Sequence, residues 1–306
     1  MKTRAIVSLF LVLLVSHTSG PPVAAFHIST HRRITLDALN RRGVKYNGVR
    51  VTFSDDATVA IDREARDFDK DAALGINLTE PFRHFDDESF EAGSRHVIEM
   101  KEKVIAELKK DDMDEWSLKR AIRYFAYGMH AIQDFYAHSN WVELGELGVV
   151  PKDICPTLGS GPFQVPIASK IETTCVENYK LSDAGLSKLT SGYWPGWSLV
   201  EVLPFVPEKC EILPNKCHHG KKSCSEGIAK DPEGEPAFKR GDPKAFEAGG
   251  PNAIKNCGKH DPDCKYREQA EQLAIKATIQ FAELIINDAA VKPHCKNVGR
   301  FMGIKL

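Results

Sequence analysis

The feature that most constrains this chain is a column of two histidines and one aspartate inside an otherwise apolar segment. His130, Asp134 and His138 recur at intervals of four residues, and on an α-helix this spacing places all three side chains along one face. Almost all of their neighbours are apolar or aromatic, which is typical of a buried helix. The segment therefore predicts a long central helix over residues 115–140 that carries ionisable groups into the core.

Such groups need a partner, because an isolated buried charge is too costly to keep. Imidazole nitrogens and carboxylate oxygens are ordinary zinc ligands, and one carboxylate can bridge two ions. The column therefore favours a metal site. A hydrogen-bonded ladder of His, Asp and His that only stabilises the core is the alternative interpretation.

Apolar residues at helical spacing predict further helices, and no convincing run of alternating residues predicts a sheet. The other expected helical segments are 29–42, 54–74, 88–110 and 265–288. Most acidic side chains of 54–74, a group that includes Asp62, are expected to be solvated, and Leu284 is expected in the apolar stripe of the last helix. The fold class is thus mainly α, with a single domain over 26–306 whose second half is rich in loops.

Residues 1–25 have the pattern of a signal peptide. A basic start precedes an apolar run from Ala5 to Val15, which at 11 residues is too short to span a bilayer. Small residues before and at Ala25 form a cleavage site, so that Phe26 becomes the first residue of the mature chain. The chain is therefore expected to be secreted and extracellular.

All eight cysteines lie after residue 150. An even count in a secreted chain predicts disulfides, which would staple a second half rich in proline and glycine. Cys210, Cys217 and Cys224 are seven residues apart and lack the paired spacing of a structural zinc site, so disulfides are favoured there. A glycosylation sequon at Asn77 is consistent with secretion.

Trp194 and Trp197 lie in a turn rich in proline and glycine. Their large apolar surfaces would face a substrate or a lipid interface, or would fill the core, and the sequence leaves these alternatives open. The formal net charge of −1 gives no general attraction to nucleic acid, and no clear nucleic-acid patch is present. The oligomeric state is not determined by the sequence.

The segment HAIQDFYAHSNWVELG, residues 130–145, resembles the signature of the Het-C family. This family includes the fungal heterokaryon-incompatibility proteins and the N-terminal part of von Willebrand factor A domain-containing protein 7. Weaker stretches agree with it at 30–39, 189–193, 216–220 and 227–231. The resemblance covers most of the expected mature chain and implies a Het-C-like helical domain.

The Het-C segment is in turn similar to the metal-binding helix of zinc-dependent phospholipases C and fungal single-strand nucleases. This similarity implies a helical phospholipase C/nuclease-like domain with two or three zinc ions, and with Asp69 and Asp134 as catalytic residues. The metal ligands that it implies are Phe26, His31, Asp69, His84, His130, Asp134, His138 and His219. The interval from Asp134 to His138 is shorter than in those enzymes. The final His-x3-acid pair is not visible; Glu143, His219 and His260 are its candidates.

The resemblance implies a secreted zinc-dependent phosphoesterase that hydrolyses a phosphodiester in a phospholipid or a nucleic acid. The alternative is a Het-C-type binding or interaction protein that retains the metal scaffold without turnover. A pore-forming or lipid-interface toxin is a third interpretation, and only the Trp194–Trp197 loop points to it.

The N-terminus offers a direct test of the expected zinc ligands. A free amine binds metal when unprotonated, and its ordinary pKa of about 7.7–8.0 permits this near neutral pH. We expect one extra residue before Phe26 to remove one equivalent of zinc, and His31→Ala to do the same, as measured by elemental analysis of the purified chain. A full metal complement in both variants would exclude the N-terminus as a ligand.

Overall fold

The computed structural model describes residues 28–73, 80–149, 163, 165–176, 180–191, 215–217 and 262–304. Within these ranges the protein is mainly helical, as the sequence predicts. The helices are α1 (Ile28–Thr35), the π-helix η1 (Leu36–Arg42), α2 (Asp55–Ala73), the 3-10 helix η2 (Pro81–His84), α3 (Phe90–Leu108), α4 (Glu115–His138), α5 (Trp141–Glu146), α6 (Asp183–Ser187), α8 (Pro262–Ile286), the 3-10 helix η6 (Lys292–His294) and α9 (Cys295–Met302). Two antiparallel hairpins join β1 (Val44–Tyr46) to β2 (Val49–Val51) and β3 (Cys175–Val176) to β4 (Lys180–Leu181).

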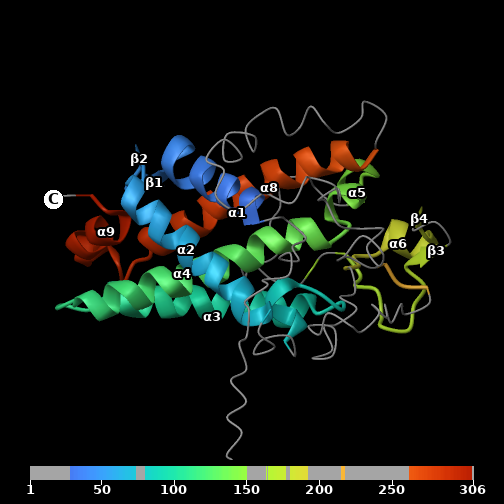
Figure 1. Ribbon diagram of the computed structural model, residues 1–306, viewed down its shortest axis with the longest axis horizontal. Coiled ribbons are helices and arrows are strands. Elements are labelled where there is room, and N and C mark those ends of the chain that lie inside the picture. Colours follow the sequence, from blue (N-terminus) through green and yellow to red (C-terminus); the bar gives the residue numbers. More distant parts are fainter. Residues whose placement is uncertain are drawn as a thin grey trace, which may run out of the picture.

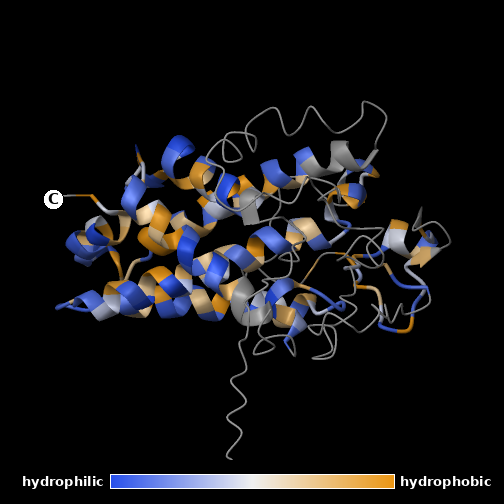
Figure 2. Cartoon of the chain, in the orientation of Figure 1, coloured by the Kyte–Doolittle hydropathy of each residue, from blue (hydrophilic) through white to orange (hydrophobic). Residues whose placement is uncertain are grey.

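Helix α4 is the centre of the fold. It packs against α2, α3 and α8, so that α3 runs along one side of it and α8 along another (Figure 1). Each of these helices alternates hydrophobic and hydrophilic residues along its length (Figure 2), and their buried apolar residues belong to one core cluster. At the N-terminus of α4, Asp114 accepts a hydrogen bond of 2.6 Å from the amide of Ser117, which satisfies one of the free amides of the first turn. The prediction of a buried central helix is confirmed.

Aromatic side chains pack on both sides of the polar column of α4. On one side, Phe125 contacts the rings of Phe53, Phe281 and Phe301. On the other, Phe135 contacts aromatic rings from the turn after η2, from α3 and from α5. These offset and edge-to-face contacts are the favoured geometries for aromatic pairs. They fix α4 rigidly against its neighbours and exclude water from the residues between.

The first and last predicted helices differ from the structure in detail. The 29–42 segment changes to a π-helix at Leu36 and ends at Gly43, which has a φ of 68°. In α8, Ala274, Phe281 and Ile285 are buried, but Leu284 is 42% exposed. The prediction for Leu284 is wrong because the face packed against α4 follows the line of these three residues, and Leu284 lies at its edge.

The hairpin over 44–51 is absent from the sequence-based prediction. Asn47 and Gly48 form its turn with φ values of 49° and 82°. An Asn-Gly pair between short apolar runs is a strong hairpin signal, so the sequence did contain the necessary information. The strands are only three residues long, too short for alternation to be recognised.

Asp62 is an exception among the acidic residues of α2, most of which are expected to be solvated, because its side chain is buried. It is 4% exposed and lies 3.2 Å from an Arg66 guanidinium nitrogen and 4.0 Å from Arg32 Nε. Burial raises the pKa of the Asp62 carboxyl, and the charges of Arg66 and Arg32 offset this only in part. Helical spacing alone does not reveal that α1 covers this face of α2.

The cysteines divide into three groups. Cys175 and Cys217 form a disulfide, which confirms that Cys217 is oxidised. Cys295 is exposed and unpaired at the start of α9, so the expectation of disulfides is wrong for this residue. Cys155, Cys210, Cys224, Cys257 and the side chain of Cys264 lie outside the described part of the structure, as do the sequon at Asn77 and both Trp194 and Trp197. Among the described helices, none has an apolar stretch long enough to cross a bilayer.

The close approach of α4 and α8 at Gly128 gives a test of the packing. A Cβ atom at this position would lie 2.7 Å from Phe281 Cζ and 3.1 Å from Met100 Cβ. Alanine gains about 1 kcal/mol in helix propensity, but overpacking costs about 1–3 kcal/mol. We expect Gly128→Ala to lower the free energy of unfolding by about 1 kcal/mol in urea denaturation.

A double-mutant cycle isolates the cause of this loss. In a Phe281→Leu background the ring is gone, so Gly128→Ala should cost less than in the native background. A more stable Gly128→Ala protein would contradict the packing.

Candidate metal centre

Five ionisable side chains from three separate segments meet against the buried face of α4. They are His31 from α1, His84 from the end of η2, and His130, Asp134 and His138 from α4. Their side chains are 1–5% exposed except that of His84, which is 15% exposed. The sequence places three of them on one helix face, and the docking of α1 and η2 brings the other two.

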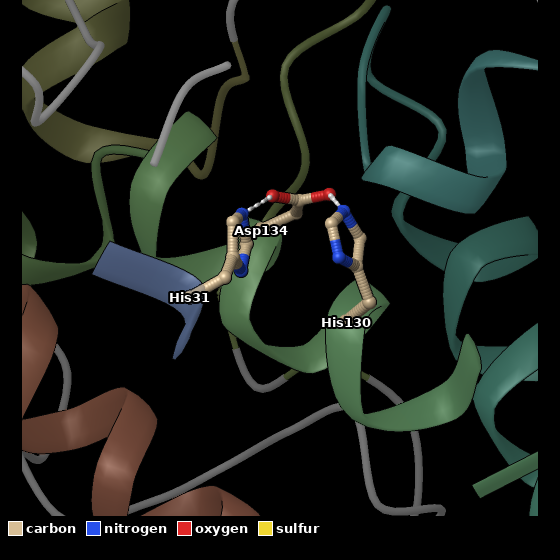
Figure 3. Close-up of side chains that lie close together, drawn as sticks. All are labelled: His31, His130 and Asp134. Atoms are coloured by element: carbon tan, nitrogen blue, oxygen red, sulfur yellow. Dashed lines mark ion pairs between the residues drawn. The ribbon is translucent and has the colours of Figure 1, made fainter. Parts of the chain in front are cut away.

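The carboxylate of Asp134 lies at the middle of the cluster, with two histidines at each oxygen. Its Oδ1 atom is 3.2 Å from His31 Nε2 and 3.5 Å from His138 Nε2. Its Oδ2 atom is 2.8 Å from His84 Nδ1 and 3.0 Å from His130 Nε2. In Figure 3 the two oxygens point in opposite directions, one toward His31 and one toward His130. This is the arrangement that a bridging carboxylate needs.

Gln133 orients the imidazole of His31. Its Oε1 atom lies 2.8 Å from His31 Nδ1, and its Nε2 atom donates to the hydroxyls of Thr35 and Thr278 at 3.3 Å each. An amide oxygen can only accept, so His31 Nδ1 carries a proton. In the neutral ring the lone pair is then on Nε2, the atom that faces Asp134.

Asp86 orients the imidazole of His138 as Gln133 orients that of His31. Its Oδ1 atom is 2.5 Å from His138 Nδ1, so that this nitrogen is the donor and the lone pair of the neutral ring is on Nε2. Two unprotonated nitrogens, those of His31 and His138, would thus face the same carboxylate oxygen. Such acceptors repel one another unless protons or a cation lie between them.

A metal cation fits this donor set. Protonating every histidine would gather several positive charges in a buried site, which is costly even with carboxylates nearby. In the metal-free chain, burial alone would raise the pKa of Asp134, but the positive charges of protonated His130 and His138 hold it well below its usual value. The carboxylate is therefore ionised, and His31, His130 and Asp134 offer donor atoms within 4.8 Å of one another, with the nitrogen and oxygen chemistry of a zinc site.

Aromatic rings enclose the cluster. The ring of Phe68, fully buried on α2, has its centroid 5.1 Å from that of His84 and 5.4 Å from that of His130. The imidazoles of His31 and His130 stack with centroids 4.2 Å apart. These contacts limit the rotation of the rings and keep bulk water out, which strengthens any electrostatic interaction inside.

The structure brings together five of the eight predicted metal ligands. Phe26, His219 and the side chain of Asp69 lie outside the described residues, so the structure leaves their predicted roles as predictions. Sequence reasoning missed the orienting roles of Asp86 and Gln133. Gln133 carried a usable signal, since it is a polar residue within the apolar part of α4 and is fully buried.

Where its side chains are described, helix α8 contacts the cluster through a hydroxyl group and not through a metal-ligating side chain. The residue of α8 that reaches the cluster is Thr278, through Gln133. Glu271 accepts two hydrogen bonds of 2.7 Å from Arg33 and is therefore committed to an ion pair. Within the described side chains of α8, no histidine completes the final pair of ligands seen in the resembling enzymes.

A known family matches most of the chain that holds this cluster. The VWA7 N-terminal domain family matches residues 64–294, well over half of the 306-residue chain. The chain belongs to this family. The matched range of the VWA7 N-terminal domain contains His84, His130, Asp134 and His138, whereas His31 precedes it.

Three relatives share the same description, von Willebrand factor A domain-containing protein 7. The protein from Homo sapiens is 33% identical over 170 residues, which are 52% of this chain and 17% of the relative. The Rattus norvegicus protein is 28% identical over 69% of this chain and 20% of its own length. The Mus musculus protein is 29% identical over 67% and 19%. The chain thus spans about a fifth of these relatives, and no solved structure matches it significantly.

His96 on α3 lies near the histidine cluster, and its burial can be tested through the pH dependence of stability. Its side chain packs near the rings of Phe68 and Phe82. Burial, with a contribution from the charge of Arg83, lowers its pKa from 6.5 to about 4. In the unfolded chain His96 therefore binds a proton below about pH 6.5, whereas in the folded chain it binds one only near pH 4. This titration removes about 3 kcal/mol of stability as the pH falls across that window.

We expect His96→Phe to abolish this part of the acid destabilisation. The measurement is urea unfolding of the metal-free protein at pH 7 and pH 4, with the native chain in parallel. The native chain should lose about 3 kcal/mol more than the variant. Equal losses in both proteins would show that His96 is not buried in its neutral form.

Proposed function

We propose that this protein is a secreted zinc-dependent phosphoesterase that hydrolyses a phosphodiester at a multinuclear metal site. The observation that carries the proposal is the convergence of four imidazoles from three segments on the single buried carboxylate of Asp134. The likeness of the 130–145 segment to zinc-dependent phospholipases C and single-strand nucleases supports the choice of substrate class.

The residues that would hold zinc are those of the cluster, together with Phe26, Asp69 and His219. Bound zinc supplies Lewis-acid stabilisation of phosphoryl oxygens and lowers the pKa of a bound water toward neutrality. Asp134 contributes the negative charge that the neutral imidazoles lack, and its two oxygens serve the two sides of the cluster. Asp69 is proposed as ligand or general base, with Asp67 as the less favoured alternative.

The chain's own contacts prepare the site for this chemistry. Gln133 and Asp86 hold protons on the far nitrogens of His31 and His138, so the near nitrogens are available as donors. Phe68 covers His84 and His130 and excludes water. Preorganised donors of this kind avoid the cost of rearrangement when a charged ligand binds.

One observation favours a second function, that of a binding protein which keeps the metal scaffold without turnover. Among the described side chains of α8, Thr278 is bound to the cluster through Gln133 and Glu271 is paired with Arg33, so neither supplies the missing His-x3-acid pair. A centre with fewer ions would still bind a phosphate group but would activate water less well. Phospholipid and nucleic acid both remain as substrates, and Trp194 and Trp197 are proposed as a lipid contact.

The central test removes the bridging charge. We expect the native protein to contain two or three zinc ions per chain and Asp134→Asn to lose most of them. Because losing an outer-shell partner already costs about 10–100-fold in metal affinity or activity, hydrolysis should fall by at least about 100-fold. Elemental analysis measures the metal, and bis(p-nitrophenyl) phosphate, phosphatidylcholine vesicles and single-stranded DNA are the three substrates.

Glu107→Gln is the matched control. Glu107 is a buried carboxylate paired with Arg120 at the other end of α4, so the change tests general destabilisation without touching the cluster. Turnover of any substrate supports hydrolysis and identifies its class. Bound zinc without turnover supports the binding function, and a native chain without zinc contradicts both.

A further inference from the structure

The turn after η2 combines a site residue with an unusual backbone. Phe85, Asp87 and Glu88 all have φ values between 56° and 59°, the left-handed region that residues other than glycine rarely adopt. This turn follows His84 directly and carries Asp86, the partner of His138. Backbone strain of this kind persists only where the surrounding structure holds it.

Glu88 joins the turn to residues far along the chain through hydrogen bonds. Its carboxylate, 2% exposed, accepts hydrogen bonds from Thr190 Oγ1 at 2.6 Å, the Ser191 amide at 2.9 Å and Lys216 Nζ at 3.1 Å. The amide of Glu88 donates to Ser191 Oγ at 2.8 Å. Both the backbone and the side chain of this residue are thus bound to the same neighbouring segment.

That segment is also bound to the end of α4. The amide of Asn140 donates to the Thr190 carbonyl at 3.1 Å, and Asn140 Oδ1 accepts from the Thr190 amide at 2.9 Å. Asn140 follows His138 by two residues, just as Glu88 follows Asp86 by two. Thr190 therefore joins the two backbone segments whose side chains meet in the contact between Asp86 and His138.

Lys216 completes the arrangement as a buried counter-charge. Its side chain is 3% exposed, and its ammonium group also donates to the Ser169 carbonyl at 2.6 Å. The next residue, Cys217, is joined to Cys175 by the disulfide. The chain entropy that the disulfide removes favours the position of Lys216, and the ion pair offsets the cost of burying Glu88.

We propose that Glu88 and Thr190 are positioning residues for the metal centre, acting through Asp86 on His138. Together with Asn140, Ser191 and Lys216 they form a cross-tie that sets the distance between the turn and the end of α4. The proposal rests on the proposed function in one respect: the distance between the turn and α4 matters because it orients His138 for metal binding. Loss of the cross-tie releases the strained turn, and the imidazole of His138 loses its orientation.

The mildest test changes one hydroxyl. Thr190→Val keeps the shape of a fully buried side chain and removes only the hydrogen bond to Glu88. We expect zinc affinity, measured by competition with a chromogenic chelator, to fall about 10-fold, at the low end of the effect of losing an outer-shell partner. Thr190→Ser restores the hydroxyl and should restore most of the affinity.

A stronger test removes both charges together. Glu88→Gln with Lys216→Met leaves no uncompensated charge in the core, and we expect a fall in zinc affinity of about 100-fold. Glu107→Gln, which breaks a partly buried ion pair far from the turn, is the control for destabilisation and should keep the native affinity. Cobalt(II) spectra of each variant report whether the remaining site keeps its ligand geometry.

A metal-free measurement separates this proposal from the proposed function. Two local backbone hydrogen bonds report on Asp86, one from the Asp86 amide to the Pro81 carbonyl and one from the Ser89 amide to the Asp86 carbonyl, each 3.0 Å long. Hydrogen exchange of these amides should accelerate in the double variant, relative to the α3 amides, and stay native in Glu107→Gln.

The outcomes are distinct. Faster exchange in the turn with weaker zinc binding supports the cross-tie. Native zinc affinity in Thr190→Val and in the double variant overturns it, as does an equal loss in Glu107→Gln. If the native chain binds no zinc, the proposed function fails and exchange alone decides: faster exchange supports the cross-tie as a holder of the turn, and native exchange overturns it.

Discussion

The negative charge of Asp134 is the constraint on which the rest of the structure depends. A carboxylate in the middle of a helix packed on all sides cannot remain ionised without compensation, and burial works against it. The surrounding imidazoles reverse this effect and keep the pKa of Asp134 low. The two histidines whose charges lower this pKa, His130 and His138, are on α4 itself. Helix α1 and the 3-10 helix η2 each bring one further histidine to an oxygen of the same carboxylate.

The second layer of the centre explains why polar residues continue beyond the histidines. Gln133 and Asp86 each accept a hydrogen bond from the outer nitrogen of an imidazole, so two rings have a defined tautomer and orientation. Asp86 lies in a strained turn, and that strain is balanced by the buried contacts of Glu88 with Thr190, Ser191 and Lys216. Local strain at a site that the fold stabilises elsewhere is the pattern expected of a functional region.

Membership of the VWA7 N-terminal domain family agrees with this distribution of residues. The matched range includes the α4 column and the η2 histidine, while the α1 histidine precedes it. The core of the centre thus lies in the part of the chain that the family shares. Helix α8 lies in the same range, and it contributes Thr278 to the hydrogen bonds around Gln133 rather than a further histidine.

The sequence by itself determined the central helix and the column of His130, Asp134 and His138, because helical periodicity is a local property that spacing reveals. It also indicated His31 and His84, through resemblance rather than through spacing. Only the tertiary structure decided that Asp62 is buried, that Leu284 is exposed and that Cys295 is unpaired, since each depends on which neighbour covers a face. The roles of Asp86, Gln133 and Glu88 were likewise invisible, because their partners lie far along the chain or depend on a ring orientation. A hydrogen bond between distant residues leaves no periodic signal, and only the packed chain brings its two atoms together.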